Sequence, residues 1–219
     1  MESQFWRERW QQGAIAFHQP HVNADLRVHW SRLNCPSTAR VFVPLCGKSV
    51  DMVWLRAQGH PVIGIEISEL AVAAFFDEQH LQPVREAAGQ LERWSAAGYE
   101  LYVGDFFDLT TAPLRGVHAA YDRAALIALP APLRTRYAQH LSALLGRSAK
   151  MLLLTMNYPQ EQMAGPPFAV SAAEVRRLFT PDFSVTQIAS RDALREEPRF
   201  QQRGLTRREE EAYLLERAE

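Results

Sequence analysis

The fold is decided by the stretch RVFVPLCGKSVDMVWLRAQGHPVIGIEIS, which occupies residues 40–68. It contains two short apolar runs, Arg40–Pro44 and Pro61–Ile65, and each is typical of a buried strand. Between them, Val50–Gln58 is predicted to be a helix, and Gly59 is well placed to end it. A strand, a helix and a second strand form a βαβ unit, in which the two strands run parallel.

The same alternation continues along the rest of the chain. Strands are predicted at Tyr99–Val103, Val117–Tyr121 and Lys150–Met156. Helices are predicted at residues 24–33, 68–80, 132–145 and 171–179. Two late strands, Phe183–Ser190 and Glu211–Arg217, have no predicted helix between them, so we expect an antiparallel hairpin at one edge. The sequence therefore predicts the α/β class, with a mainly parallel, doubly wound, Rossmann-like sheet covered by helices on both faces.

Length and composition indicate one domain. The 219 residues contain no repeat or linker, so we expect a single domain over 1–219, with leading helices at 1–36 and the sheet at 37–219. Lys and Arg number 24 and Asp and Glu number 25, and the resulting net charge of -1 favours neither nucleic acid nor a membrane as a partner. With no long apolar window and no secretory leader visible, we expect a cytoplasmic protein. The sequence shows no heptad pattern that would indicate a coiled-coil oligomer, so we expect a monomer.

Metal and disulfide chemistry are not indicated. The two cysteines, Cys35 and Cys46, form no C-x-x-C pair, so a structural zinc site lacks its usual ligands. We interpret them as reduced thiols. His18 and His21 have an H-x-x-H spacing without a third ligand nearby in sequence, so we interpret them as polar loop residues and predict no metal.

The first candidate binding residue is Glu66, at the end of the second predicted strand. Ligands of an open parallel sheet bind beyond the carboxyl ends of its strands. Glu66 follows Gly47, in the first turn, by 19 residues. A carboxylate at that point can accept hydrogen bonds from the 2′- and 3′-hydroxyls of a ribose. The alternative interpretation is a solvent-facing glutamate at a strand end.

The turn Leu45–Ser49 argues against two other kinds of nucleotide site. Gly47 and Lys48 imitate the end of a P-loop, but Phe42 stands where the first P-loop glycine would be. The dinucleotide pattern G-x-G-x-x-G also fails, because Gly47 is alone in the turn. A lone glycine turn with a ribose carboxylate points to a nucleoside ligand without a pyrophosphate, and S-adenosylmethionine fits that description.

The later strand ends carry further candidates. Asp105 with Phe106 can recognise an adenine, or else they are a turn aspartate and a core phenylalanine. Asp122 and Arg123 form a charged pair inside the apolar stretch AAYDRAALIAL. Because burying charge is costly unless it is paired or used, we favour a functional pair over an ion pair that merely starts a helix.

Two aromatic side chains near the start of the chain complete the set. Trp10 and Phe17 can receive a sulfonium cation on their faces, whereas in the alternative interpretation Trp10 packs a helix on the sheet. The arginine-bearing loop Arg195–Arg203 can close over an anionic acceptor, or it is plain surface.

Several segments together carry a resemblance to a known family. They are FWRERW, AFHQPHVN, RVFVPLCGKSVDMVWL, VIGIEISELAV, YDRAALIAL, GPPFAVSAAEVRRLF and EEAYLLE. From about Phe5 to Glu216 the chain resembles the thiopurine S-methyltransferase family, and in order and spacing it is similar to the bacterial members. The resemblance implies a seven-stranded class I methyltransferase sheet, S-adenosyl-L-methionine as methyl donor and S-adenosyl-L-homocysteine as product.

The resemblance also implies roles for single residues. The residues matched to the methyl donor are Trp10, Leu45, Glu66, Asp105, Phe106 and Arg123. The residues matched to the acceptor pocket are Phe17, Pro166 and Arg199. We assign catalysis to Arg123, which would stabilise an anionic acceptor, and to Asp122, which would orient Arg123 or help to remove a proton.

The predicted reaction is in-line transfer of a methyl group to the thiolate of a thiopurine or a related aryl or heterocyclic thiol. The N-terminal helices would act as a lid, with Trp10 and Phe17 as its inner surface. One alternative is a methyltransferase whose natural acceptor is a selenium or tellurium compound or another small thiol. More remote alternatives are a non-catalytic nucleoside-binding protein and an NAD-dependent oxidoreductase.

Overall fold

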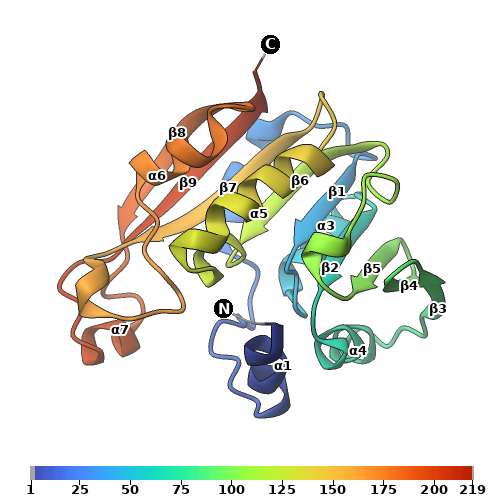
Figure 1. Cartoon of the computed structure of the whole chain (residues 1–219), viewed down its shortest axis with the longest axis horizontal. Coiled ribbons are helices and arrows are strands. Elements are labelled where there is room, and N and C mark those ends of the chain that lie inside the picture. The colour runs from blue at the N-terminus through green and yellow to red at the C-terminus, as the bar shows by residue number, and fades with distance from the viewer. Residues whose placement is uncertain (1–2, 219) are drawn as a thin grey trace.

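The computed structural model describes residues 3–218, which form one nine-stranded sheet with helices on both faces (Figure 1). The strands are β1 (Arg40–Pro44), β2 (Val62–Glu66), β3 (Val84–Ala88), β4 (Leu91–Ala96), β5 (Tyr99–Val103), β6 (Val117–Arg123), β7 (Lys150–Asn157), β8 (Phe183–Asp192) and β9 (Glu209–Arg217). Their order across the sheet is β3-β4-β5-β2-β1-β6-β7-β9-β8.

The centre of the sheet is parallel, as predicted. β1 pairs in parallel with both β2 and β6, β5 extends the sheet beyond β2, and β7 extends it beyond β6. Side chains alternate along β1, so Val41 and Val43 enter one apolar core and Phe42 enters the other. Both faces of this strand are buried, which is why its sequence is a continuous apolar run.

The C-terminal hairpin is also confirmed. β8 pairs antiparallel with β9, and β9 pairs antiparallel with β7, so β8 lies at the edge. The expectation of a helix-free connection was wrong, because α7 (Pro198–Gln202) lies between the two strands. A helix of 5 residues is too short to show a helical period in sequence, and it does not cross the sheet, so the hairpin stays antiparallel.

Two strands extend the predicted seven. β3 and β4 form an antiparallel hairpin that adds to the sheet beyond β5. The sequence analysis missed them because β3 is the opposite edge strand and four of its five positions are exposed, so no apolar alternation marks it. The hairpin is held by Trp94 of β4, which is 1% exposed and stacks against Phe76.

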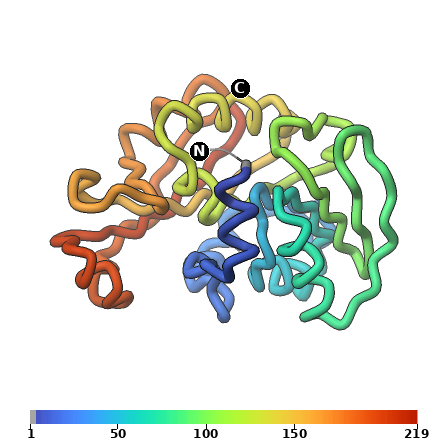
Figure 2. The backbone as a smooth tube through the Cα atoms, turned by 60° about the horizontal axis from the view of Figure 1, so that its bottom comes forward, coloured from blue at the N-terminus to red at the C-terminus, as the bar shows by residue number. Residues whose placement is uncertain are grey.

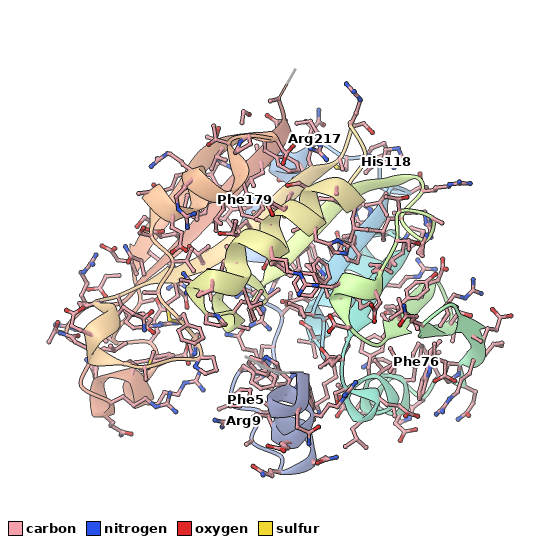
Figure 3. The ribbon with its side chains drawn as sticks, in the orientation of Figure 1. Phe5, Arg9, Phe76, His118, Phe179 and Arg217 are labelled. Atoms are coloured by element: carbon pink, nitrogen blue, oxygen red, sulfur yellow. The ribbon has the colours of Figure 1, made fainter. Side chains whose placement is uncertain are left out.

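Helices cover the two faces of the sheet. The helices are α1 (Ser3–Gln11), α2 (Ala24–His29), α3 (Val50–Ala57), α4 (Glu69–Glu78), α5 (Ala131–Leu144) and α6 (Ala172–Phe179). One core contains apolar side chains of α2, α3 and α4, among them Phe76, and the other contains those of α5 and α6, among them Phe179 (Figure 3). The two cores confirm the doubly wound arrangement. Among residues 3–218, no helix has the length and apolar character to cross a membrane.

The helix α1 lies apart from both cores, at the end of the sheet where its parallel strands finish (Figure 1). Figure 2 brings this end forward and shows the blue helix near the middle of the view, with the orange-red segment around α7 to one side. Phe5 and Arg9 lie on this helix, and the Arg9 guanidinium carbon is 4.9 Å from the centroid of the Phe5 ring (Figure 3). The segment is therefore placed to cover whatever the strand ends hold.

Candidate active site

A cavity of about 700 Å³ opens beyond the carboxyl ends of the parallel strands. Nine of the ten residues predicted for the site line it, and these are Trp10, Phe17, Leu45, Glu66, Asp105, Phe106, Arg123, Pro166 and Arg199. They come from α1 and the segment that follows it, from the last residues of β2 and β6, from the turns after β1, β5 and β7, and from α7. The topology thus gathers residues that are spread over most of the sequence. The tenth, Asp122, is not among the residues that line the cavity.

Glu66 ends β2 and is 5% exposed. Its Oε2 accepts a hydrogen bond from the backbone N–H of Gly47 at 2.9 Å, and its Oε1 accepts one from the backbone N–H of Ser68 at 2.9 Å. Burial raises the pKa of this carboxyl, while the backbone N–H donors lower it. Since each carboxylate oxygen has two lone pairs, both oxygens keep an acceptor position for a further donor.

The turn after β1 brings backbone close to α1. Leu45 has φ +48° and Gly47 has φ +52°, so both lie in the left-handed region. A Cβ on Gly47 would lie 3.1 Å from Cζ2 of Trp10, which is tighter than an ordinary contact. Glycine is required here because it tolerates the positive φ and leaves room for the indole ring. The strained Leu45 backbone sits at the cavity wall, as such residues often do at functional sites.

The turn after β5 combines an aspartate cap with aromatic rings packed at an angle to one another. Asp105 Oδ1 accepts a hydrogen bond from the Phe107 N–H at 2.9 Å and so starts a short 3₁₀ helix, Phe106–Asp108. Phe106 is 3% exposed and packs against Tyr137, with ring centroids 4.9 Å apart. Phe107 also lines the cavity, half-buried, and the sequence analysis did not single it out.

Arg123 ends β6, and its partner is Asp51 rather than Asp122. Its Nε donates to Oδ2 of Asp51 at 2.9 Å, and the same oxygen accepts from the Tyr121 hydroxyl at 3.0 Å. Asp51 stands in the first turn of α3, and its side chain is 1% exposed. Neither terminal nitrogen of Arg123 has a hydrogen-bond partner within residues 3–218. The guanidinium is thus held through Nε, and Arg123 lines the cavity.

Asp122 points to the other face of the strand, because neighbouring side chains on a strand alternate. Its Oδ2 accepts from the Tyr137 hydroxyl at 2.7 Å and its Oδ1 accepts from the Leu126 N–H at 3.2 Å. Burial raises the pKa of Asp122 to about 6, although these hydrogen bonds lower it. Asp122 therefore does not contact Arg123, and the contact expected of it is made by Asp51, which the sequence analysis missed.

An aromatic cluster forms the wall of the cavity on the side of α1. Phe17 meets Trp6 and Trp10 edge to face, with centroids 5.6 Å and 5.5 Å away. The Arg199 Nη1 donates to the backbone carbonyl of Ala16 at 2.5 Å and ties this segment to α7. His18 lines the cavity as well, and burial lowers its pKa. Within residues 3–218, no group of three His, Cys, Asp or Glu side chains could hold a metal ion.

Solved methyltransferases share this fold. An S-adenosylmethionine-dependent methyltransferase from Anabaena variabilis aligns with a TM-score of 0.67 at 16% identity, covering 99% of this chain and 95% of that chain. The 1,6-didemethyltoxoflavin-N1-methyltransferase of Burkholderia thailandensis, solved with bound S-adenosylhomocysteine, aligns with a TM-score of 0.67 at 14% identity, covering 99% and 87%. The fold is therefore that of the S-adenosylmethionine-dependent α/β methyltransferases.

Sequence comparison narrows the class to one family. The profile of the family Thiopurine S-methyltransferase (TPMT) matches residues 1–218. The thiopurine S-methyltransferase of Nitrosospira multiformis is 47% identical over 215 residues, which cover 98% of each chain. That of Xanthomonas campestris pv. campestris is 48% identical over 217 residues, covering 99% of this chain and 100% of the relative. The chain belongs to the thiopurine S-methyltransferase family, as its sequence segments predicted.

Proposed function

We propose that the chain is an S-adenosylmethionine-dependent S-methyltransferase that acts on thiopurines and related aryl or heterocyclic thiols. Family membership supports the class of reaction, and the thiopurine S-methyltransferases of Nitrosospira and Xanthomonas support the class of acceptor. The observation that carries the proposal is that one cavity is lined both by Glu66, whose carboxylate is buried, and by Arg123, whose terminal nitrogens have no hydrogen-bond partner in residues 3–218.

The residues of the cavity fit S-adenosylmethionine. Glu66 keeps an acceptor position on each carboxylate oxygen, which suits the two hydroxyls of a ribose. Gly47 leaves room for the Trp10 ring beside the first turn, and the face of that ring suits a sulfonium. Asp105, Phe106 and Leu45 complete the proposed donor site, with the adenine at the turn after β5 and the methionine part at the turn after β1.

When bound, the donor supplies a methyl group that its sulfonium charge already activates for displacement. The protein then has to align the two reactants and exclude water. Arg123 is placed to stabilise the acceptor thiolate with charge-assisted hydrogen bonds from its two terminal nitrogens. Heteroaryl thiols ionise readily, so no strong general base is required. This agrees with the position of Asp122, which bonds to Tyr137 and Leu126 outside the cavity lining.

The segment up to residue 36 is proposed to act as a lid over a core that begins at residue 37. Trp10 and Phe17 would form its inner surface, and Pro166 the facing wall of the acceptor pocket. The hydrogen bond from Arg199 to Ala16 would hold the closed arrangement. We propose further that the enzyme works as a cytoplasmic monomer, and sedimentation of the purified chain would test the monomer directly.

The proposal is tested with the purified chain, labelled methyl donor and a panel of acceptors. The panel pairs a thiopurine and an aryl thiol with their oxygen analogues and with a selenol. We expect label on sulfur, with little or none on oxygen. Absence of transfer to every acceptor would overturn the proposed function, and transfer to the selenol alone would overturn the thiol as acceptor.

A further inference from the structure

The carboxylate of Asp51 accepts hydrogen bonds from three donors, which belong to two other parts of the chain. Its Oδ1 accepts from the backbone N–H of Asn23 at 2.8 Å, and its Oδ2 accepts from the Tyr121 hydroxyl at 3.0 Å and from Arg123 Nε at 2.9 Å. The side chain of Asp51 is 1% exposed and that of Arg123 is 14% exposed. We propose that Asp51 is a positioning residue, which holds the Arg123 guanidinium with its terminal nitrogens toward the acceptor.

The contact through Nε gives Asp51 this effect. Nε lies in the plane of the guanidinium, so a bond from Nε to a fixed oxygen limits rotation of the whole planar group. The oxygen is itself fixed, because the Tyr121 hydroxyl bonds to it and the other carboxylate oxygen is anchored by Asn23. Asn23 in turn caps α2 through its side chain, with bonds to the N–H groups of Asp25 and Leu26.

The terminal nitrogens of Arg123 are left free for a ligand. Neither has a protein partner in the described part of the chain, and Arg123 lines the cavity. An arginine that only closed an ion pair would commonly offer both nitrogens of its fork to the carboxylate. Here one bond at the base of the fork fixes the group, and the two outer nitrogens keep their hydrogen-bonding capacity. The inference rests on the proposed function, since it assigns the free nitrogens to the acceptor.

The test uses Asp51→Asn, which keeps the volume of the side chain and the acceptor for Asn23. With the amide oxygen toward Asn23, its nitrogen would meet the Nε–H of Arg123, donor against donor. With the amide turned round, Arg123 would lose the negative charge of its partner and the nitrogen would meet the Asn23 N–H, so the guanidinium is held less firmly in either orientation. We expect kcat/KM for the thiol acceptor to fall at least 10-fold. The same substitution in an Arg123→Met background should cause less than a 2-fold further loss, because the group that Asp51 orients is gone.

A spectroscopic readout keeps the inference separate from the proposed function. In arginine-labelled wild-type protein without ligands, we expect the Nε–Hε signal of Arg123 to be sharp and slow to exchange with solvent. In Asp51→Asn that signal should broaden or exchange faster, while the backbone amide spectrum stays that of the folded protein. The control is Glu100→Gln, which breaks ion pairs with Arg40 and Arg93 on the sheet and should leave the Arg123 signal unchanged.

Two results would overturn the inference. One is an Arg123 signal that does not change in Asp51→Asn, and the other is a loss of kcat/KM that is equally large with and without Arg123, as a purely structural role predicts. If Asp51→Asn does not fold, Asp51→Glu keeps the charge and displaces the guanidinium by one methylene, and both comparisons are made with it. A wild type that methylates no acceptor would defeat the proposed function, while the spectra would still decide the role of Asp51.

Discussion

Replacement of Glu66 by glutamine is the sharpest test of the donor site. The change keeps the shape of the side chain but turns one acceptor oxygen into a donor. Since Oε1 and Oε2 each accept a backbone N–H at 2.9 Å, one of these bonds becomes a contact between two donors in either orientation of the amide. The ribose would also lose one of its two acceptors and the negative charge behind them.

The magnitude follows from the number of charged hydrogen bonds that are affected. A hydrogen bond to a charged group contributes about 1.5–3 kcal/mol. Loss of one such bond to the ribose should therefore raise the dissociation constant of S-adenosylhomocysteine by roughly 10- to 150-fold. Isothermal titration calorimetry of the purified variant measures this constant directly, and a thermal melt of the same sample shows whether the turn around Gly47 and Ser68 has been disturbed.

A matched control is available three residues away. Glu69 begins α4, and its side chain is 60% exposed and pairs with Arg85 on the surface. Glu69→Gln should change the affinity less than 2-fold, because exposed ion pairs contribute little. If Glu66→Gln bound S-adenosylhomocysteine within 2-fold of the wild type, the ribose role of Glu66 would be refuted.

Three further predictions concern other parts of the cavity. Arg123→Ala should lower the acceptor's kcat/KM at least 10-fold, or about 1.4 kcal/mol, in a steady-state assay, and full activity would show that the arginine is structural. Asp122 has a folded pKa of about 6 against 3.8 for the free side chain, so the folded state binds its proton more tightly and wild-type stability is lost as pH rises through about 6. Relative to Asp122→Asn, the wild type should lose about 2 kcal/mol of unfolding free energy between pH 4 and pH 7 in urea titrations, whereas parallel pH curves would contradict this. Gly47→Ala should cost about 1–2 kcal/mol of stability through its positive φ and press on Trp10, while Gly146→Ala, with open space around its Cβ, should cost less; equal melting temperatures for the two would contradict the argument.

Most elements of the sheet could be predicted because they are buried on both faces. Arg40–Pro44 was predicted with the bounds that β1 has, and the end of β2 lies at Glu66, one residue beyond the predicted run. The edge strand β3 escaped detection for the opposite reason. Its side chains are mostly exposed, so its sequence reads like a charged loop, and only pairing with β4 makes it a strand.

The sequence predicted which residues of the candidate site follow a strand, but not the direction in which each side chain points. Strand ends and turns identified Glu66, Asp105 and Arg123, because a residue that follows a parallel strand must lie at the ligand-binding edge. The rule gives the position of a residue along the strand but not the face to which it points. That is why Asp122, next to Arg123, was expected in the cavity and is instead bonded to Tyr137 on the other side.

The sequence by itself determined the α/β class, the family and the position of Glu66 at the end of the second strand, because these depend on strand order, short motifs and spacing along the chain. Tertiary structure alone decided the partner of Arg123. Asp51 and Arg123 are 72 residues apart, on α3 and β6. The start of α3 follows β1, and only the parallel pairing of β1 with β6 brings the two charges to 2.9 Å. An ion pair between distant segments leaves no periodic signal in sequence, since its geometry exists only after the sheet has formed.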